Sequence, residues 1–222
     1  LKMKRIKSKE LLFELNEKDF TASVIGCFSI DSRITIPRSI KYQGQNYIIT
    51  SIGKGSFQNN NYILTIEFSE NSEIRSICKG AFTDSQLINL SIPPKLTKLE
   101  EGWCKSTLNL THISLSPHNQ HYRYQNDEFL LGKSDPKSDT FDTLLFCCRS
   151  IEKAVIPSTI KYISSFCFSE CSSLQSIEFS ENSGLVSIGK YAFSDTSIKE
   201  ISIPFCVKSI GKCCFYGCSN LE

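Results

Sequence analysis

Apolar residues recur along this chain in a fixed short pattern. The segment Leu87–Pro93 has the form apolar-x-x-apolar-x-apolar and ends in proline, with Leu87, Leu90 and Ile92 at its apolar positions. Copies of this form begin at Ile63, Leu110, Ile151, Leu174 and Ile198, and a first, partial copy ends in Ile34 and Ile36. On either side of one break, successive copies are 23 or 24 residues apart. Because side chains alternate along a strand, the pattern predicts a short strand per repeat with an apolar inner face and a polar outer face.

Each repeat has a second half, which reads apolar-x-x-apolar, usually glycine, and then a small residue followed by an aromatic one. The copies contain the phenylalanines Phe57, Phe82, Phe168, Phe193 and Phe215. One copy is degenerate, since Trp103 takes the small position and Cys104 the aromatic one. We expect these phenylalanines to stack as a row inside the convex side of the molecule.

A unit of this length cannot bury its own apolar face, and stacking units pairs strand with strand and builds one continuous core. The repeats therefore predict an α/β or mainly β solenoid, with about seven first strands in one parallel sheet. Within it, Leu90 and Ile113 should be buried neighbours one rung apart. Prolines directly after the strand end the pairing, and they stand at Pro37, Pro93, Pro157 and Pro204.

These motifs resemble the BspA-like leucine-rich repeats. The clearest copy runs from Ile203–Pro204 through Ile210–Gly211 and Cys214–Phe215 to Leu221. The variant Ile177–Ser183 and its twin Ile66–Ser72 look like those of trichomonad members. The resemblance covers the chain from about Phe28 onward and implies a right-handed leucine-rich-repeat superhelix. It also implies a surface antigen that adheres to host matrix proteins or to other cells.

Two regions stand outside the repeat. Residues 1–27 contain two short apolar runs around a polar turn, which predict an N-terminal capping hairpin for the solenoid of residues 28–222. Residues 116–150 interrupt the period, and the runs Phe129–Leu131 and Leu144–Phe146 predict an inserted hairpin. The chain begins at Leu1 and stops where a further repeat should start, so we interpret it as a fragment.

Candidate binding residues come from the insertion and from the outer face of the first strands. We predict that the insertion is the main recognition element, because aromatic residues and arginine are enriched at interface hot spots. In the alternative interpretation, Tyr122, Tyr124 and Phe129 fold under and cap an irregular rung. The predicted protein-binding residues are His118, His121, Tyr122, Arg123, Tyr124, Glu67, Ser91, Ser114, Glu178 and Ser202.

Composition and short motifs exclude several classes of function. The formal net charge is +2, which gives no reason to expect a nucleic-acid partner. No apolar run is long enough for a membrane helix, and the basic residues 2–7 are not followed by the apolar stretch of a signal peptide. We find no motif for a nucleophile, a phosphate loop or a dinucleotide, so we expect no enzyme, cofactor or catalytic residue.

Histidines and cysteines are the candidate metal ligands of this chain. His118 and His121 lack a cysteine or glutamate in a tight ligand pattern, so no metal is expected. Cys167, Cys171, Cys214 and Cys218 fall in small slots of the repeat, which favours free structural thiols over disulfides between neighbouring rungs, and we expect most of the 11 cysteines to be free. The side chains of the neighbours Cys147 and Cys148 should diverge in extended chain. Two glycosylation sequons, at Asn89 and Asn109, do not indicate whether the chain is secreted.

Two functions remain in competition. The first is a cell-surface adhesion or antigen ectodomain that binds host or matrix proteins, and the second is an intracellular scaffold for protein–protein interaction. The outer face of the first strands is small, polar and nearly uncharged, which predicts weak binding strengthened by avidity.

Overall fold

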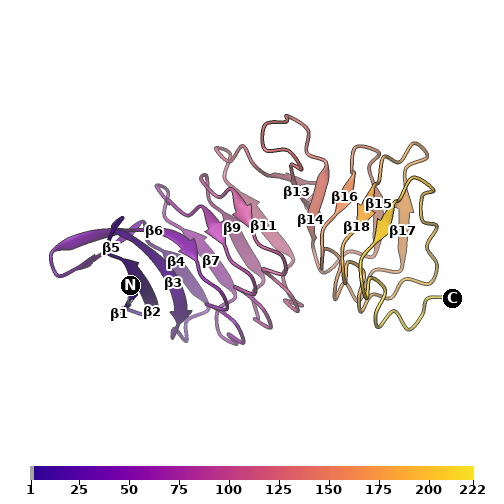
Figure 1. Cartoon of the computed structure of the whole chain (residues 1–222). Coiled ribbons are helices and arrows are strands. Elements are labelled where there is room, and N and C mark those ends of the chain that lie inside the picture. The colour runs from indigo at the N-terminus through magenta and orange to yellow at the C-terminus, as the bar shows by residue number, and fades with distance from the viewer. Residues whose placement is uncertain (1–2) are drawn as a thin grey trace. The chain divides into compact units, whose positions relative to one another are not determined.

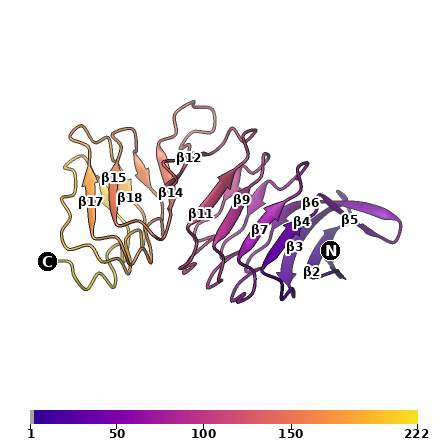
Figure 2. The ribbon, with the colours of Figure 1, turned by 180° about the vertical axis from the view of Figure 1, so that it is seen from behind.

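The structure is a computed structural model that describes residues 3–222, built entirely of strands and turns, with no helix in that range. Leu1 and Lys2, the first residues of the expected cap, lie outside the described residues. The chain divides into two compact units, Leu1–Gln120 and His121–Glu222. Figures 1 and 2 show that each unit is a stack of short strands joined by turns. The expected β-solenoid is confirmed.

The first unit opens with an antiparallel meander of β1 (Lys4–Ser8), β2 (Leu11–Asn16) and β3 (Thr21–Cys27). Burial alternates along β2, where Leu11, Phe13 and Leu15 are buried. The last strand of the meander, β3, pairs in parallel with β6 (Gln45–Ile52), so the meander covers the first rung. This confirms the predicted N-terminal hairpin and adds β1 as a third strand.

The second half of each repeat also forms a short strand. These second strands continue from β6 as a parallel ladder. It runs through β8 (Ser76–Ile77) to β10 (Lys98–Leu99). The N-terminal half of β6 also forms a tight hairpin with β5 (Ser39–Tyr42). Gln43 and Gly44 in that turn have φ of 49° and 81°, the left-handed backbone that a two-residue hairpin turn requires.

First strands of this unit form a separate parallel sheet. Its four members are β4 (Arg33–Ile36), β7 (Thr65–Phe68), β9 (Asn89–Ile92) and β11 (His112–Leu115). Leu90 faces Ile113 in the register, and both side chains are buried, as the repeat predicted. The outward residues of β9 are only half-buried, so the apolar inner face and polar outer face are both present.

The second unit repeats the same plan. It opens with an antiparallel meander of β12 (Arg123–Gln125), β13 (Phe129–Gly132) and β14 (Thr143–Cys147). From β14 a parallel ladder continues through β16 (Tyr162–Ile163), β18 (Ser187–Ile188) and β19 (Ser209–Ile210). The predicted inserted hairpin is therefore confirmed as β13 and β14. It does for the second unit what the N-terminal meander does for the first.

The expectation of one parallel sheet holding about seven first strands needs correction. In the second unit only β15 (Lys153–Ile156) and β17 (Ser176–Phe179) pair, as a sheet of their own. The insertion interrupts the succession of first strands between β11 and β15 and gives its own strands to the second-strand ladder. The repeat at Ile198–Ile203 forms no strand.

Aromatic side chains form the expected row in each unit. The ring centroids of Phe57 and Phe82 are 5.6 Å apart, and those of Phe168 and Phe193 are 5.0 Å apart. In the ladder beneath them, the N–H of Phe57, Phe82, Phe168 and Phe193 each donates to the carbonyl of the small position one rung on. Trp103 accepts such a bond from Phe82, which places it in the small slot as expected. Its ring lies edge-on to Phe82, so the row continues.

Turns of successive rungs share a backbone conformation. Two left-handed residues stand four positions apart in each, with φ between 52° and 72°. The pairs are Gly55 and Asn59, Gly80 and Asp84, Gly102 and Ser106, Phe166 and Glu170, Tyr191 and Asp195, and Cys213 and Gly217. The first unit uses glycine at the first position of each pair, whereas the second unit uses larger residues.

Candidate protein-binding surface

Outward side chains of the first strands in the first unit pair with one another along the stack. Arg33 Nη1 lies 2.7 Å from Glu67 Oε1, across β4 and β7. Asn89 Nδ2 donates to Thr65 Oγ1 at 3.1 Å, and the Oγ atoms of Ser91 and Ser114 are 3.0 Å apart. Alternation along each strand and the 23–24-residue register bring these polar groups together. Glu67, Ser91 and Ser114 therefore lie in one row, as the sequence predicted.

A shallow groove of about 240 Å³ lies at the proline end of this row. Ser91 and Ser114 line it, together with Pro93, Pro94 and Glu70. Its wall is partly apolar because Ile92 and Leu115, the last residues of β9 and β11, line it together with Pro93. The groove thus offers hydroxyl groups and proline rings to a partner.

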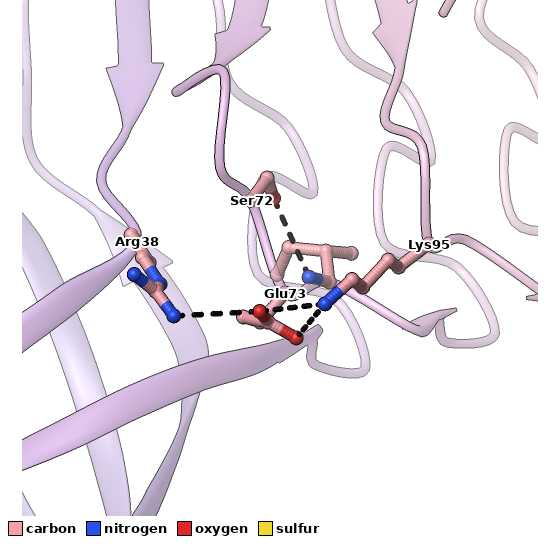
Figure 3. Close-up of polar contacts among 5 residues, drawn as sticks. Arg38, Ser72, Glu73 and Lys95 are labelled. Atoms are coloured by element: carbon pink, nitrogen blue, oxygen red, sulfur yellow. Dashed lines mark hydrogen bonds and ion pairs between the residues drawn. The ribbon is translucent and has the colours of Figure 1, made fainter. Parts of the chain in front are cut away.

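Three rungs are tied together beside this groove by the carboxylate of Glu73, shown in Figure 3. Lys95 Nζ lies 2.7 and 2.9 Å from its two oxygens, and Arg38 Nη2 lies 3.5 Å from one of them. The hydrogen bond from Lys95 lowers the pKa of Glu73, and the charge of Arg38 acts in the same direction. Sequence reasoning missed this network. The signal was available, since all three residues follow the first strands of successive repeats.

The outer face of the second unit is built the same way but exposes apolar groups. Lys153 Nζ of β15 lies 2.6 Å from Glu178 Oε1 of β17. Beside Glu178, a groove of about 620 Å³ runs between β17 and residues 200–206, where no strand closes it. Ser202 lines this groove, and so does Phe205, whose side chain is 102% exposed. The groove therefore joins two predicted residues to an aromatic ring with no cover among the described residues.

The structure places the predicted residues of the insertion in different environments. Tyr122 and Phe129 are buried, with Tyr122 only 7% exposed, as the capping interpretation expected. Tyr124 donates from its hydroxyl to the carbonyl of Asp127 at 2.7 Å. Arg123 is exposed, and its guanidinium lies 4.5 Å from the centre of the Phe141 ring. Because it is exposed, Arg123 is the residue of this group best placed to contact a partner.

His118 and His121 fall on either side of the division between the two units. His118 is exposed and its backbone N–H reaches Ser116 Oγ at 3.4 Å, whereas His121 is half-buried. Within residues 3–222, no group of three or more histidine, cysteine or acidic side chains is arranged to hold a metal ion. The same residues include no helix of the length and hydrophobicity needed to cross a bilayer.

Asp142 anchors the long loop of the insertion. Its carboxylate accepts hydrogen bonds from the Ser134 N–H at 2.8 Å and the Ser134 hydroxyl at 2.7 Å, and Lys161 Nζ lies 3.7 Å away. Burial by itself raises the pKa of Asp142, but the bonds from Ser134 and the charge of Lys161 outweigh it and lower the pKa. The loop between β13 and β14 is therefore fixed at its base.

Comparison with known proteins identifies this architecture. The family described as BspA type leucine rich repeat region matches residues 2–126 and 140–222, in six copies. The chain belongs to the BspA-type leucine-rich-repeat family. Apart from Leu1, the unmatched residues are 127–139, inside the insertion, so the loop fixed by Asp142 is where this BspA-type chain departs from the repeat. No curated protein sequence matches the chain.

Several solved structures are similar to this BspA-type chain. A leucine rich cell surface protein from Faecalibacterium prausnitzii is 17% identical with a TM-score of 0.53, over 99% of this chain and 87% of that one. A leucine-rich repeat protein from Eubacterium ventriosum is 19% identical with a TM-score of 0.61, over 97% and 76%. The pneumococcal vaccine antigen PcpA is 16% identical with a TM-score of 0.51, over 99% and 80%. Identities this low show the fold alone.

Proposed function

We propose that this chain is a non-enzymatic, protein-binding ectodomain displayed at a cell surface, where it binds host-matrix or cell-surface proteins. The observation that carries the proposal is the groove of the second unit. Leucine-rich-repeat proteins generally bind other proteins, and this groove offers the open Phe205 ring beside the carboxylates of Glu178 and Glu200. Aromatic residues bury much area at low entropic cost, which makes Phe205 the expected anchor.

The location is supported by what similar structures are called. One is described as a cell surface protein and another as a vaccine antigen. A repeat scaffold at a surface needs no catalytic centre and gains strength from many weak contacts. The polar row of Glu67, Ser91 and Ser114, with the insertion around Arg123, would then widen the contact beyond Phe205.

An intracellular scaffold is the second candidate, and the cysteines favour it. All 11 cysteines are free thiols in the structure. Thiols persist in reducing compartments, whereas exported proteins usually pair them. Labelling of intact cells with a reagent that cannot cross the membrane separates the two. Labelled chain supports the ectodomain, and chain labelled only after lysis supports the scaffold.

Binding itself is tested with Phe205→Ala, measured against cells and immobilised matrix proteins. We expect binding to fall roughly tenfold or more, the loss typical of a hot-spot residue. The matched control is Tyr62→Ala, because Tyr62 is also an exposed aromatic residue but lies away from both grooves. Equal binding by the two variants would contradict the proposal for this groove.

A further inference from the structure

A cluster of thiols and one guanidinium lies at the end of the inserted hairpin, outside the surface described above. Cys147, Cys167 and Cys171 have no exposed surface, and Cys148 and Arg149 are 5% and 3% exposed. They come from two adjacent rungs, since the Cys147 N–H donates to the Cys167 carbonyl at 3.2 Å. Four sulfur atoms and a permanent positive charge thus share one buried site.

The geometry brings three of these sulfur atoms together. The thiols of Cys147 and Cys171 lie 3.6 and 3.8 Å from the same acceptor, the carbonyl oxygen of Cys148. The influence of Cys147 on the pKa of Cys148 and of Cys171 also places its side chain close to both. The expectation that Cys147 and Cys148 diverge is therefore wrong. Strand β14 ends at Cys147, so the backbone is no longer extended where the two side chains leave it.

Arg149 makes this site different from an ordinary buried thiol. Its Nη1 donates to the Cys167 carbonyl at 3.0 Å and lies 3.5 Å from Cys171 Sγ. Its guanidinium also lies 4.7 Å from the centre of the Phe146 ring, which fixes its plane. A cation held this close to sulfur, away from water, stabilises the thiolate over the thiol.

Hydrogen bonds and the charge of Arg149 together separate the acidities of the thiols, and the pKa of Cys148 falls to about 6 chiefly through its hydrogen bond with Cys147. Burial raises the pKa of Cys171, but the hydrogen bond from Cys147 and the charge of Arg149 outweigh it and hold the pKa below its ordinary value of 9.0. Burial raises the pKa of Cys147 well above 9.0, so this thiol keeps its proton. Cys214 is a useful contrast, because it is buried without such a cation and its pKa rises to about 11.

We propose that Cys171 and Cys147 are a peroxide-sensitive thiol pair, which closes into a disulfide across two rungs when hydrogen peroxide enters the site. The Cys171 thiolate attacks one peroxide oxygen, the O–O bond breaks, and the leaving hydroxide takes a proton to become water. Cys171 is then a sulfenic acid. The Cys147 sulfur attacks it, the S–S bond forms, and the hydroxyl leaves as a second water with the Cys147 proton. Two thiols are oxidised and one peroxide is reduced to two waters.

The full burial of Cys171 and Cys147 determines which oxidants can react with them. Neither Cys171 nor Cys147 has exposed surface, so an oxidant reaches the pair only when the packing opens transiently, and a small peroxide needs a much smaller opening than a peptide disulfide does. Cys148 is the member nearest solvent, and its Sγ lies 3.7 Å from Ser150 Oγ. Hydrogen peroxide should therefore oxidise the pair, and glutathione disulfide should leave it reduced.

The test is peptide mapping of the reduced full chain after limited peroxide, with remaining thiols blocked under denaturing conditions. We expect a Cys147–Cys171 linked peptide that has lost two hydrogen atoms and is restored by dithiothreitol. In Cys147→Ser the reaction should stop at the sulfenic acid of Cys171, trapped by dimedone. Cys214→Ala is the control and should form the link at the wild-type rate.

Arg149 is tested through the pH profile. In Arg149→Gln the link should form about tenfold or more slowly at neutral pH, because less Cys171 is thiolate, and should recover as the pH is raised toward 9. Arg149→Lys keeps the charge and covers the case in which the glutamine variant does not fold. The proposal is overturned if peroxide leaves Cys147 and Cys171 reduced, or if glutathione disulfide links them equally fast.

Discussion

Residues with left-handed backbone conformation in the turns show how single positions maintain the geometry of the repeat. A residue with a Cβ at positive φ costs roughly 1 kcal/mol relative to glycine. The first unit avoids this cost with Gly55, Gly80 and Gly102, whereas the second unit places Tyr191 and Cys213 at equivalent turns. Tyr191 gains contacts there, since its ring stacks on Phe166 with centroids 5.3 Å apart.

This asymmetry predicts opposite effects of two substitutions. Gly80→Ala should lower the free energy of unfolding by about 1 kcal/mol, because φ at this position is 66°. Cys213→Gly should raise it by up to about 1 kcal/mol, because φ there is 56°. Urea unfolding of both variants gives the values. Effects of the same sign would show that neighbouring contacts, and not the backbone conformation, decide these positions.

Buried aromatic residues should carry a larger share of the stability. Phe193 is fully buried between Phe168 and Phe215, at centroid distances of 5.0 and 5.6 Å. Phe193→Ala should cost roughly 3–5 kcal/mol, the range for deleting a buried phenylalanine. Phe205→Ala removes the same side chain from an exposed position and should change thermal stability little. A similar melting temperature in both variants would place Phe193 outside the core.

At the scale of elements, the insertion emerges as a cap. Its hairpin pairs in parallel with β16 through β14, as the N-terminal meander pairs with β6 through β3. A first rung otherwise exposes backbone groups and an apolar face. The burial of Phe129, Leu130 and Leu131 shows that the insertion covers such a face. Its structural role is therefore clear even where its binding role stays a prediction.

Asp142 makes that cap dependent on pH. Its folded pKa lies below the ordinary 3.8, so its stabilising contribution is complete above pH 3.8 and is lost as the pH falls through the folded value. Asp142→Asn should lower the free energy of unfolding at pH 7 by roughly 1–3 kcal/mol. The difference from the unsubstituted chain should shrink below pH 3.8. Asp139→Asn, in the exposed part of the same loop, is the control, and a difference that persists at low pH would contradict the assignment.

Short-range pattern was sufficient for the strands and their facing sides. Leu90 and Ile113, the phenylalanine row and the hairpin of β13 and β14 all follow from period and turn chemistry. The same pattern was not sufficient to predict which strands pair along the stack, because pairing depends on the residues one rung away. Ile198–Ile203 carries the same apolar pattern as β17 yet forms no strand. Likewise, the Glu73 and Arg149 contacts join residues about 20 positions apart, which no single repeat displays.

At the scale of the whole chain, each unit has its own cap and its own second-strand ladder. Units with separate cores fold independently when each buries enough apolar surface. We therefore expect residues 121–222, produced alone, to keep a cooperative thermal transition and the β-sheet circular dichroism of the full chain. Residues 153–222, which lack the meander of β12 to β14, are the control and should lose that transition. Identical behaviour of the two fragments would show that the meander is dispensable.

The ladder of rungs also determines how the protein responds to pulling. Backbone bonds between rungs join each one to the next, as in Phe57 to Ala81 and Phe82 to Trp103. Tension on the two ends would therefore peel rungs one at a time, since within residues 3–222 the bonds of this ladder join each rung to the next one along. Each rung released would lengthen the tether by roughly 80 Å, the extended span of one repeat. For an adhesive protein under flow, such stepwise yielding would dissipate load while the remaining rungs keep hold of the partner.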